Sequence, residues 1–472
     1  MMRFNCIPTE MALLSLFAVL SASVLSLCDA LSVQPRQSSS QYTYVDLSVN
    51  NGASVHRASG VLYGVPDVQG QIPSSFYTGM GFNYLSAGGA QDPAATGWIY
   101  GGYTTRILEV ISNYKTARTY GAQFILKMSD IWGADGTQAT TAIWPGDNGS
   151  YTEFDRFLAQ LVSDLKANSM TTNIKILIWN EPDLGTVFWY PGQARYLAMW
   201  SHAVTYLRTN LPGVPIAGPA FANSPVSTNT WWTAFLAQVK ADGTAPDVYT
   251  WHHEGDITST LDDLQTTQPN MVAMLNSYGL TVGEFIIDEY GTSAEQVPSG
   301  AAWWISRLER YNMSGMRGNW ASGAQLHDFL AGLLGKTDVD SATGTGYFAN
   351  GEWNVYNYYA TTMTGYRVKT TGSTDRLMDC YAVVGTNVVR ILVGGRVITG
   401  TYELVIENLS SLGLATSGTI TVHTYQFAYA GVYVASPVTD LGTYAHTYTG
   451  NTLSLPIYQT STTTTWAFEF PF

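Results

Sequence analysis

Apolar and polar residues follow two different periods along the chain, and the change between them falls near residue 363. Before it, short apolar runs predict strands, and apolar residues at three- and four-residue spacing predict helices. The helical spacing is clearest at Phe154, Phe157, Leu158, Leu161 and Leu165. We predict eight strands, at residues 60–65, 82–86, 123–128, 174–179, 215–218, 248–252, 285–289 and 318–321. We predict helices between them, among others at residues 103–120, 153–166, 193–209, 229–241, 261–278 and 301–311.

Eight strands that alternate with helices indicate a parallel α/β architecture, and eight is the number that closes a (β/α)8 TIM barrel. A doubly wound open sheet is the alternative. We disfavour it because no glycine-rich phosphate-binding turn follows the first strand. Chemistry in such barrels lies at the carboxyl ends of the strands. Polar residues at those ends are therefore the candidates for function.

Beyond residue 363 the helical spacing disappears. Alternating or β-branched runs, separated by Gly, Asn and Ser turns, predict a C-terminal all-β sandwich domain. Its clearest strands are residues 388–393, 401–406, 419–425 and 464–470. We assign residues 53–362 to the barrel and residues 363–472 to the sandwich. Residues 31–52 combine a polar leader with an early strand, 42–49, which could join the sandwich.

The first thirty residues have the pattern of a secretory signal peptide. Arg3 supplies a basic start, residues 11–27 are apolar, and residues 28–30 (CDA) form a cleavage site. No later segment is apolar for the roughly 20 residues that a membrane span requires. We therefore expect a secreted, extracellular protein with no membrane segment after residues 1–30 are removed.

Secretion changes how the cysteines and the asparagine triplets are interpreted. Cys6 and Cys28 would leave with the signal peptide, so Cys380 would remain as a single cysteine in an apolar strand, where we expect a buried small hydrophobe. Three triplets match the N-glycosylation pattern in a secreted protein. They begin at Asn148, Asn312 and Asn408.

Composition and charge restrict the partners. Hydrophobic residues make up 46% and charged residues 12%, which is typical of an ordered globular protein. A net charge of −13 disfavours nucleic acid and anionic membranes. Thirty Tyr and fourteen Trp could provide platforms for sugar rings, although we expect most of them in the core. The sequence leaves the oligomeric state open.

Two predicted strands end in a carboxylate. Residues 174–179 (IKILIW) run directly into Asn180, Glu181 and Pro182, and residues 285–289 end in Glu289. The ends of strands four and seven face each other across the mouth of a closed barrel. Cleavage of a glycosidic bond with retention needs such a pair, one carboxyl as proton donor and one as nucleophile, about 5–5.5 Å apart. Asn180 would then donate to the 2-hydroxyl of the sugar.

The chain resembles the clan of retaining glycosidases on (β/α)8 barrels called clan A. The resemblance rests on residues 179–182 (WNEP) and on a Glu at the end of strand seven. Residues 287–293 (IDEYGTS), residues 247–252 (DVYTWH) and the trailing β-domain resemble glycoside hydrolase family 39. That resemblance implies Glu181 as acid/base and Glu289 as nucleophile. It also implies His252 near the nucleophile and Trp320 as a sugar platform.

One departure from the clan concerns the end of strand two, where its members carry an Arg that braces the nucleophile. This chain has Ser86 near that position and no Arg. We expect either Gln91 or a residue from another strand to take the role, or a reshaped subsite.

Other residues at strand ends have two interpretations. Asp130 and Trp132, after strand three, either bind sugar hydroxyls or shape the loop. His252, His253 and Glu254 suggest a metal, but adjacent strand residues point to opposite faces and no third ligand has suitable spacing. We expect no metal and no cofactor. A Ser-His-Asp hydrolase is disfavoured because no Gly-x-Ser-x-Gly turn follows a strand.

We therefore predict a secreted retaining glycosidase that acts on oligo- or polysaccharides of plant or microbial cell walls, with β-xylosidase-like or related exo action. An endo-acting polysaccharide hydrolase and an arabinoside or uronide hydrolase are alternatives on the same barrel. A non-catalytic carbohydrate-binding protein is the alternative from another class.

Overall fold

The computed structural model describes residues 41–90, 96–185 and 187–472. The predicted signal peptide, the leader up to residue 40, and Gln91 lie outside these residues. None of the described helices is long and apolar enough to cross a membrane.

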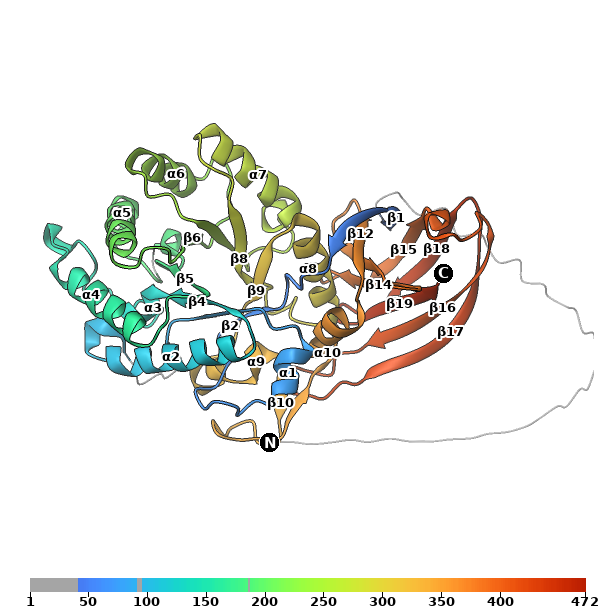
Figure 1. The fold of residues 1–472 in the computed structure, drawn as a ribbon, viewed down its shortest axis with the longest axis horizontal. Helices are drawn as coiled ribbons and strands as arrows, with labels where there is room; N and C mark the ends of the chain where they lie inside the picture. Colours follow the sequence, from blue (N-terminus) through green and yellow to red (C-terminus); the bar gives the residue numbers. More distant parts are fainter. Residues whose placement is uncertain (1–40, 91–95, 186) are drawn as a thin grey trace, which may run out of the picture. The chain divides into compact units, whose positions relative to one another are not determined.

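Eight parallel strands form a closed barrel, as the sequence predicts (Figure 1). Each strand pairs with the next along the chain, and the last pairs with the first. The strands are β2 (Gly60–Leu62), β3 (Tyr84–Ala87), β4 (Gln123–Lys127), β5 (Ile174–Leu177), β6 (Ile216–Phe221), β7 (Val248–His253), β8 (Glu284–Tyr290) and β9 (Ser314–Arg317). All eight carboxyl ends therefore open at one mouth.

Helices surround the barrel (Figure 1). The main ones are α2 (Tyr103–Thr119), α4 (Thr152–Ala167), α5 (Gln193–Asn210), α6 (Thr230–Asp242), α7 (Leu264–Ser277) and α8 (Pro298–Tyr311). Shorter helices are α1 (Ser74–Gly79), α3 (Met128–Trp132), α9 (Phe329–Gly332) and α10 (Gly351–Asn357). The five apolar residues that predict α4 are all buried, which follows from their position on one face of the helix.

The prediction of strand eight at residues 318–321 was wrong. The strand is β9, and residues 318–321 form the loop that follows it. The sequence of β9 (SGMR) has a weak apolar signal because one of its four residues is the charged Arg317. Arg317 is nevertheless buried, since a distant partner, Glu352, accepts hydrogen bonds from it at 2.8 and 2.7 Å. Local hydrophobicity therefore could not locate this strand.

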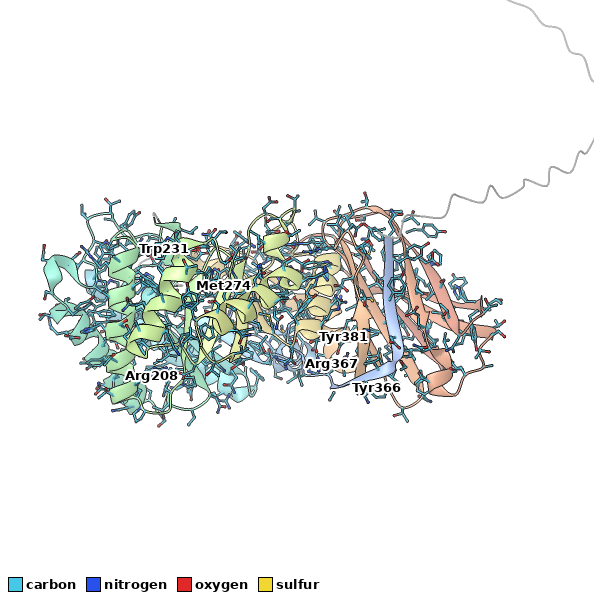
Figure 2. The ribbon with its side chains drawn as sticks, turned by 90° about the horizontal axis from the view of Figure 1, so that it is seen from above. Arg208, Trp231, Met274, Tyr366, Arg367 and Tyr381 are labelled. Atoms are coloured by element: carbon cyan, nitrogen blue, oxygen red, sulfur yellow. The ribbon has the colours of Figure 1, made fainter. Side chains whose placement is uncertain are left out.

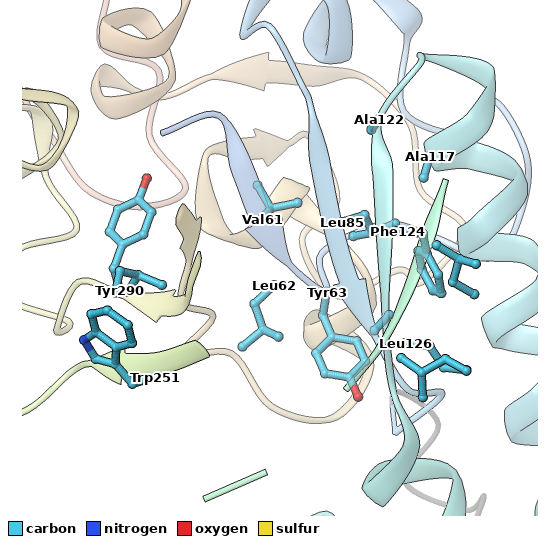
Figure 3. Close-up of a cluster of buried hydrophobic side chains, with 14 of the residues drawn as sticks. Val61, Leu62, Tyr63, Leu85, Ala117, Ala122, Phe124, Leu126, Trp251 and Tyr290 are labelled. Atoms are coloured by element: carbon cyan, nitrogen blue, oxygen red, sulfur yellow. The ribbon is translucent and has the colours of Figure 1, made fainter. Parts of the chain in front are cut away.

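Two clusters of apolar side chains form the core of the barrel and of its contacts with the helices. Leu85, Phe124 and Leu126 belong to the large cluster that includes Ala117 of α2 (Figure 3). A second, smaller cluster takes residues from seven strands, as expected for side chains that point to the barrel axis: Tyr84, Ile125, Leu177, Ala217, Ala220, Val248, Ile286 and Met316. The barrel is therefore a packed core with its chemistry confined to the mouth.

The C-terminal domain is one continuous nine-stranded sheet, in the order β17-β16-β19-β14-β13-β12-β1-β15-β18. Its strands are β1 (Tyr42–Ala53), β12 (Tyr366–Thr371), β13 (Met378–Val384), β14 (Val388–Gly395), β15 (Gly400–Glu407), β16 (Gly418–Phe427), β17 (Val438–Tyr448), β18 (Thr452–Gln459) and β19 (Thr465–Pro471). Residues from both ends of the sheet, such as Val422 and Leu455, share one core with the buried Cys380, so the sheet folds over itself. The early strand β1 lies inside it, between β12 and β15. A small separate sheet joins β10 (Leu334–Lys336) to β11 (Tyr347–Ala349).

Helix α8 joins the barrel to the sheet. It packs on β13 and β14, and Glu309 near its end binds Arg367 of β12 at 2.8 Å. Arg367 and Tyr381 mark this junction in Figure 2. At the other end of the helix, Arg396 binds Asp262 at 2.9 Å and also pairs with Glu295. Buried ion pairs of this kind hold the two domains in one arrangement.

Candidate active site

Glu181 lies just beyond β5, after the three buried residues Ile178, Trp179 and Asn180. Its backbone adopts φ +39° and ψ +48°, a left-handed conformation that is uncommon for any residue except glycine. The Glu181 N–H donates to the carbonyl of Ala220 at 2.9 Å, and Ala220 also has a positive φ. Backbone strain of this kind persists where the surrounding structure enforces it, and it concentrates at functional sites.

Glu289 lies one residue before the end of β8, and a β-bulge precedes it. Trp251 pairs with Ile287, whereas the next residue of β7, His252, pairs with Glu289. Asp288 is therefore the extra residue of β8. A bulge changes the direction of side chains, which explains why Asp288 and Glu289 both reach His252.

His252 lies among three carboxylates. Its Nδ1 is 2.8 Å from Glu181 Oε1, and its Nε2 is 3.3 Å from Asp288 Oδ2 and 3.8 Å from Glu289 Oε1. Burial opposes the charge on this imidazole, but Glu289, Asp288 and Glu181 together raise the pKa of His252 well above its usual value. The surrounding carboxylates therefore favour the protonated form of the ring.

A lysine holds the nucleophile candidate. Lys127, the last residue of β4, donates to Glu289 Oε1 and, at 2.9 Å, to Asn180 Oδ1. Burial opposes ionisation of Glu289, yet His252 and Lys127 lower its pKa below the ordinary value. Ser86 is buried in β3, and its hydroxyl has no partner among the described residues. Clan members brace the nucleophile with an Arg at the end of the second barrel strand, which is β3 here. In this chain the contact to Glu289 comes instead from Lys127 of β4, the third barrel strand.

The same lysine orients Asn180. Because the ammonium group of Lys127 occupies Oδ1, the Nδ2 group of the amide is left to donate to a ligand. A donor is what the 2-hydroxyl interaction requires. Lys127 therefore positions two of the predicted site residues, Asn180 and Glu289, at once.

A cavity of about 460 Å³ opens at this end of the barrel. Its lining includes Tyr63, Arg106, Lys127, Asp130, Asn180 and Glu289. Tyr63 donates to Asp130, whose other oxygen accepts from Ser129 at 2.9 Å. Burial raises the pKa of Asp130, and Lys127 opposes this effect. The cavity wall is thus polar on the side where the carboxylates lie.

The two predicted tryptophans have different environments. Trp132 is completely buried, with its ring 5.5 Å from that of Phe154 and 5.3 Å from that of Phe157, which favours the interpretation that it shapes this segment over a contact with sugar hydroxyls. Trp320 is 52% exposed in the loop after β9, and its indole N–H donates to the carbonyl of Gly291 at 3.0 Å. Its neighbours Asn319 and Ala321 line the cavity, and its role as a sugar platform stays a prediction.

Glu254 and Lys127 are site residues that the sequence did not assign to a sugar site. Glu254 follows β7 directly, is half-buried, and forms a hydrogen bond with Glu289. Lys127 could have been suspected, since a lysine at the end of the apolar run 124–127 is unusual in a barrel strand. The sequence pattern suggested Glu254 only as a possible metal ligand.

Over the described ranges, no group of three or more His, Cys, Asp and Glu residues has metal-binding geometry.

His253 faces away from the mouth. Its Nδ1 is 2.8 Å from Asp262 and its Nε2 is 3.0 Å from Thr267 of α7. The alternation along β7 therefore sends His252 to the carboxylates and His253 into the helix layer.

The three glycosylation candidates differ in accessibility. Asn148 and Asn312 are exposed. Asn408 is half-buried, and its amide donates to Asp46 of β1 at 2.7 Å. We therefore expect Asn148 and Asn312 to be the more accessible acceptors.

Several known proteins that resemble this chain carry the names of glycoside hydrolases. No family model matches the chain. A curated relative, 3-O-alpha-D-galactosyl-alpha-L-arabinofuranosidase from Bifidobacterium longum subsp. longum, is 24% identical over 395 residues, which cover 72% of this chain and 32% of the relative. The chain thus spans about a third of the length of that relative.

Solved structures share the whole fold. N2152 from Neocallimastix frontalis has a TM-score of 0.73 and 21% identity, over 91% of this chain and 99% of that one. The GH39 enzyme from Xanthomonas axonopodis pv. citri has a TM-score of 0.55 and 11% identity, over 95% and 100%. The neighbours confirm the predicted resemblance to clan A barrels with a β-domain, family 39 among them.

Proposed function

We propose that this protein is a retaining glycoside hydrolase in which Glu181 is the acid/base and Glu289 the nucleophile. The observation that carries the proposal is that Glu181, beyond β5, and Glu289, near the end of β8, both lie against one imidazole, that of His252, at 2.8 and 3.8 Å. The cavity that Glu289 lines, with Arg106, Asp130 and Asn180 also in its wall, supports a carbohydrate ligand.

The reaction proceeds in two displacements. Glu289, kept ionised by Lys127 and His252, attacks the anomeric carbon while Glu181 gives its proton to the departing oxygen. Glu181, now an anion, then takes a proton from water, which attacks the glycosyl ester and releases Glu289. Asn180 donates to the 2-hydroxyl as positive charge develops on the ring.

For the substrate we propose a terminal sugar of plant cell-wall polysaccharides, removed by exo action. A cavity of about 460 Å³ lies in the size range of small-ligand sites, which supports a small terminal unit. The name of the curated relative favours an α-L-arabinofuranoside over a β-xyloside as the first substrate to test. The signal-peptide pattern of the first thirty residues supports secretion, which detection of the full chain in culture medium would test.

The test is hydrolysis of a panel of aryl glycosides, with the anomer of the first product observed by NMR. We expect retention, loss of turnover in Glu289→Gln with sugar binding preserved, and a defect in Glu181→Gln that is greatest for poor leaving groups. Glu403→Gln, in β15 of the C-terminal sheet, is the control. A wild-type protein that binds oligosaccharides and cleaves none of the panel would instead be a carbohydrate-binding protein.

A further inference from the structure

Glu254 lies against the strand ends that carry Glu289. It follows β7, and its Oε1 occupies the space where a side chain on Gly318 would lie. Gly318 follows β9, and its N–H donates to the carbonyl of Tyr290 at 2.9 Å. A residue with a Cβ at position 318 would overlap with the Glu254 carboxyl. The backbone is thus shaped to admit this carboxyl beside the nucleophile.

Two carboxyl groups that share a hydrogen bond need one proton between them, because two anions at that distance repel each other. Glu254 and Glu289 form such a pair. The charged groups that face it are His252 on β7, Lys127 on β4 and Glu181 after β5. Both cations contact or lie next to Glu289, and Lys127 donates to it directly. Their position favours the anion on Glu289 and the proton on Glu254.

The titration of Glu254 agrees with this assignment. Burial raises its pKa well above the usual value, and the charge of Glu289 raises it further, with His252 and Lys127 opposing them. The pKa of Glu289 is lowered in the same site. The two carboxyls thus differ in the direction that leaves Glu254 neutral.

We propose that Glu254 is a positioning residue that stays protonated in the resting enzyme and donates its O–H to Glu289. The nucleophile is then held from two sides, by Lys127 and by Glu254. This inference rests on the proposed function for its effect on catalysis, although the protonation of Glu254 is a property of the folded chain alone.

The activity test compares Glu254→Gln with Glu254→Ala on an aryl glycoside whose leaving group needs little protonation, so that Glu181 has little influence on the rate. Gln keeps a donor toward Glu289, and we expect kcat/KM within about threefold of wild type at acidic pH. Ala removes the donor to a charged group, and we expect a loss of about 10–100-fold. We also expect the alkaline limb of kcat/KM to move to higher pH in Glu254→Gln, since that variant has no carboxyl to ionise beside Glu289.

A second test needs no substrate. A carboxyl whose pKa is raised on folding contributes stability below its unfolded pKa of about 4.3, and this stability is lost as the pH rises toward the folded value. The melting temperature of Glu254→Gln relative to wild type should therefore increase from about pH 4 to pH 8, and this increase should exceed the change that Glu403→Gln shows over the same range.

These outcomes separate the two proposals. A melting-temperature gap that grows with pH supports the protonated Glu254, even if the wild-type protein hydrolyses no glycoside and the proposed function fails. A gap that does not change with pH would overturn the protonated state. In an active enzyme, equal losses in Glu254→Gln and Glu254→Ala with an unmoved alkaline limb would overturn the positioning role.

Discussion

Replacement of Lys127 by methionine removes the charge that holds the nucleophile while it keeps most of the volume of the side chain. Lys127 and Glu289 are 3% and 10% exposed, so water cannot replace the lost contact fully. A hydrogen bond to a charged group contributes about 1.5–3 kcal/mol. Lys127 makes one to Glu289 and one to Asn180, and we expect roughly 3–4 kcal/mol of lost transition-state stabilisation. Since about 1.36 kcal/mol is tenfold in rate, kcat/KM should fall ~10²–10³-fold.

The pH profile gives a second readout of the same variant. Glu289 must be ionised to attack, so activity is lost as the pH falls through its pKa. Lys127 is one of the two cations that lower this pKa, and its removal should move the acidic limb of kcat/KM to higher pH.

The assay is kcat/KM against pH on an activated aryl glycoside, with circular dichroism to check folding, since a broken buried pair costs about 3–5 kcal/mol of stability. Lys127→Arg is the matched control. It keeps the charge, and it should restore the position of the acidic limb even where its planar group fits less well. If Lys127→Met is folded, lies within about threefold of wild type and shows an unmoved limb, Lys127 does not brace the nucleophile.

Three further predictions concern the site and the packing around it. In wild-type enzyme, the acidic limb of kcat/KM should lie below the ordinary pKa of a Glu side chain, because the pKa of Glu289 is lowered; a limb above that value contradicts the assignment. Trp132→Ala should lower the free energy of unfolding by about 3–5 kcal/mol in chemical denaturation, with KM unchanged, because the ring is a core residue. A changed KM would return Trp132 to the site. Arg396→Met should lower the melting temperature, because it removes a buried cation that contacts both Glu295 and Asp262, and it should leave the pH profile as in wild type.

Much of the barrel could be predicted because its signals are local. The spacing of apolar residues located α4 and α8 to within three residues at each end, and seven of the eight strands overlap their predicted positions. The eighth was misplaced because β9 is stabilised by the Arg317–Glu352 pair, which joins residues 35 positions apart. The C-terminal strands were found in the same way, whereas their union in one folded sheet depends on pairings between distant strands.

The site residues also differ in whether a local sequence pattern could locate them. Glu181 and Glu289 could be placed at the mouth from the sequence, because a carboxylate at or just beyond the carboxyl end of a buried strand has few other positions in a barrel. Their neighbours could not. The bulge at Asp288 depends on how β8 pairs with β7 and β9, and no local pattern encodes that register.

The sequence by itself therefore determined the architecture and the two principal carboxylates, since strand and helix periods and strand ends are properties of short segments. Only the tertiary structure decided which groups control those carboxylates. Lys127 reaches Glu289 across 162 positions of the chain, and Glu254 reaches it because Gly318 leaves space beside β8. Closure of the barrel brings these strand ends together, and electrostatic interactions between buried groups depend on that proximity and on the exclusion of water.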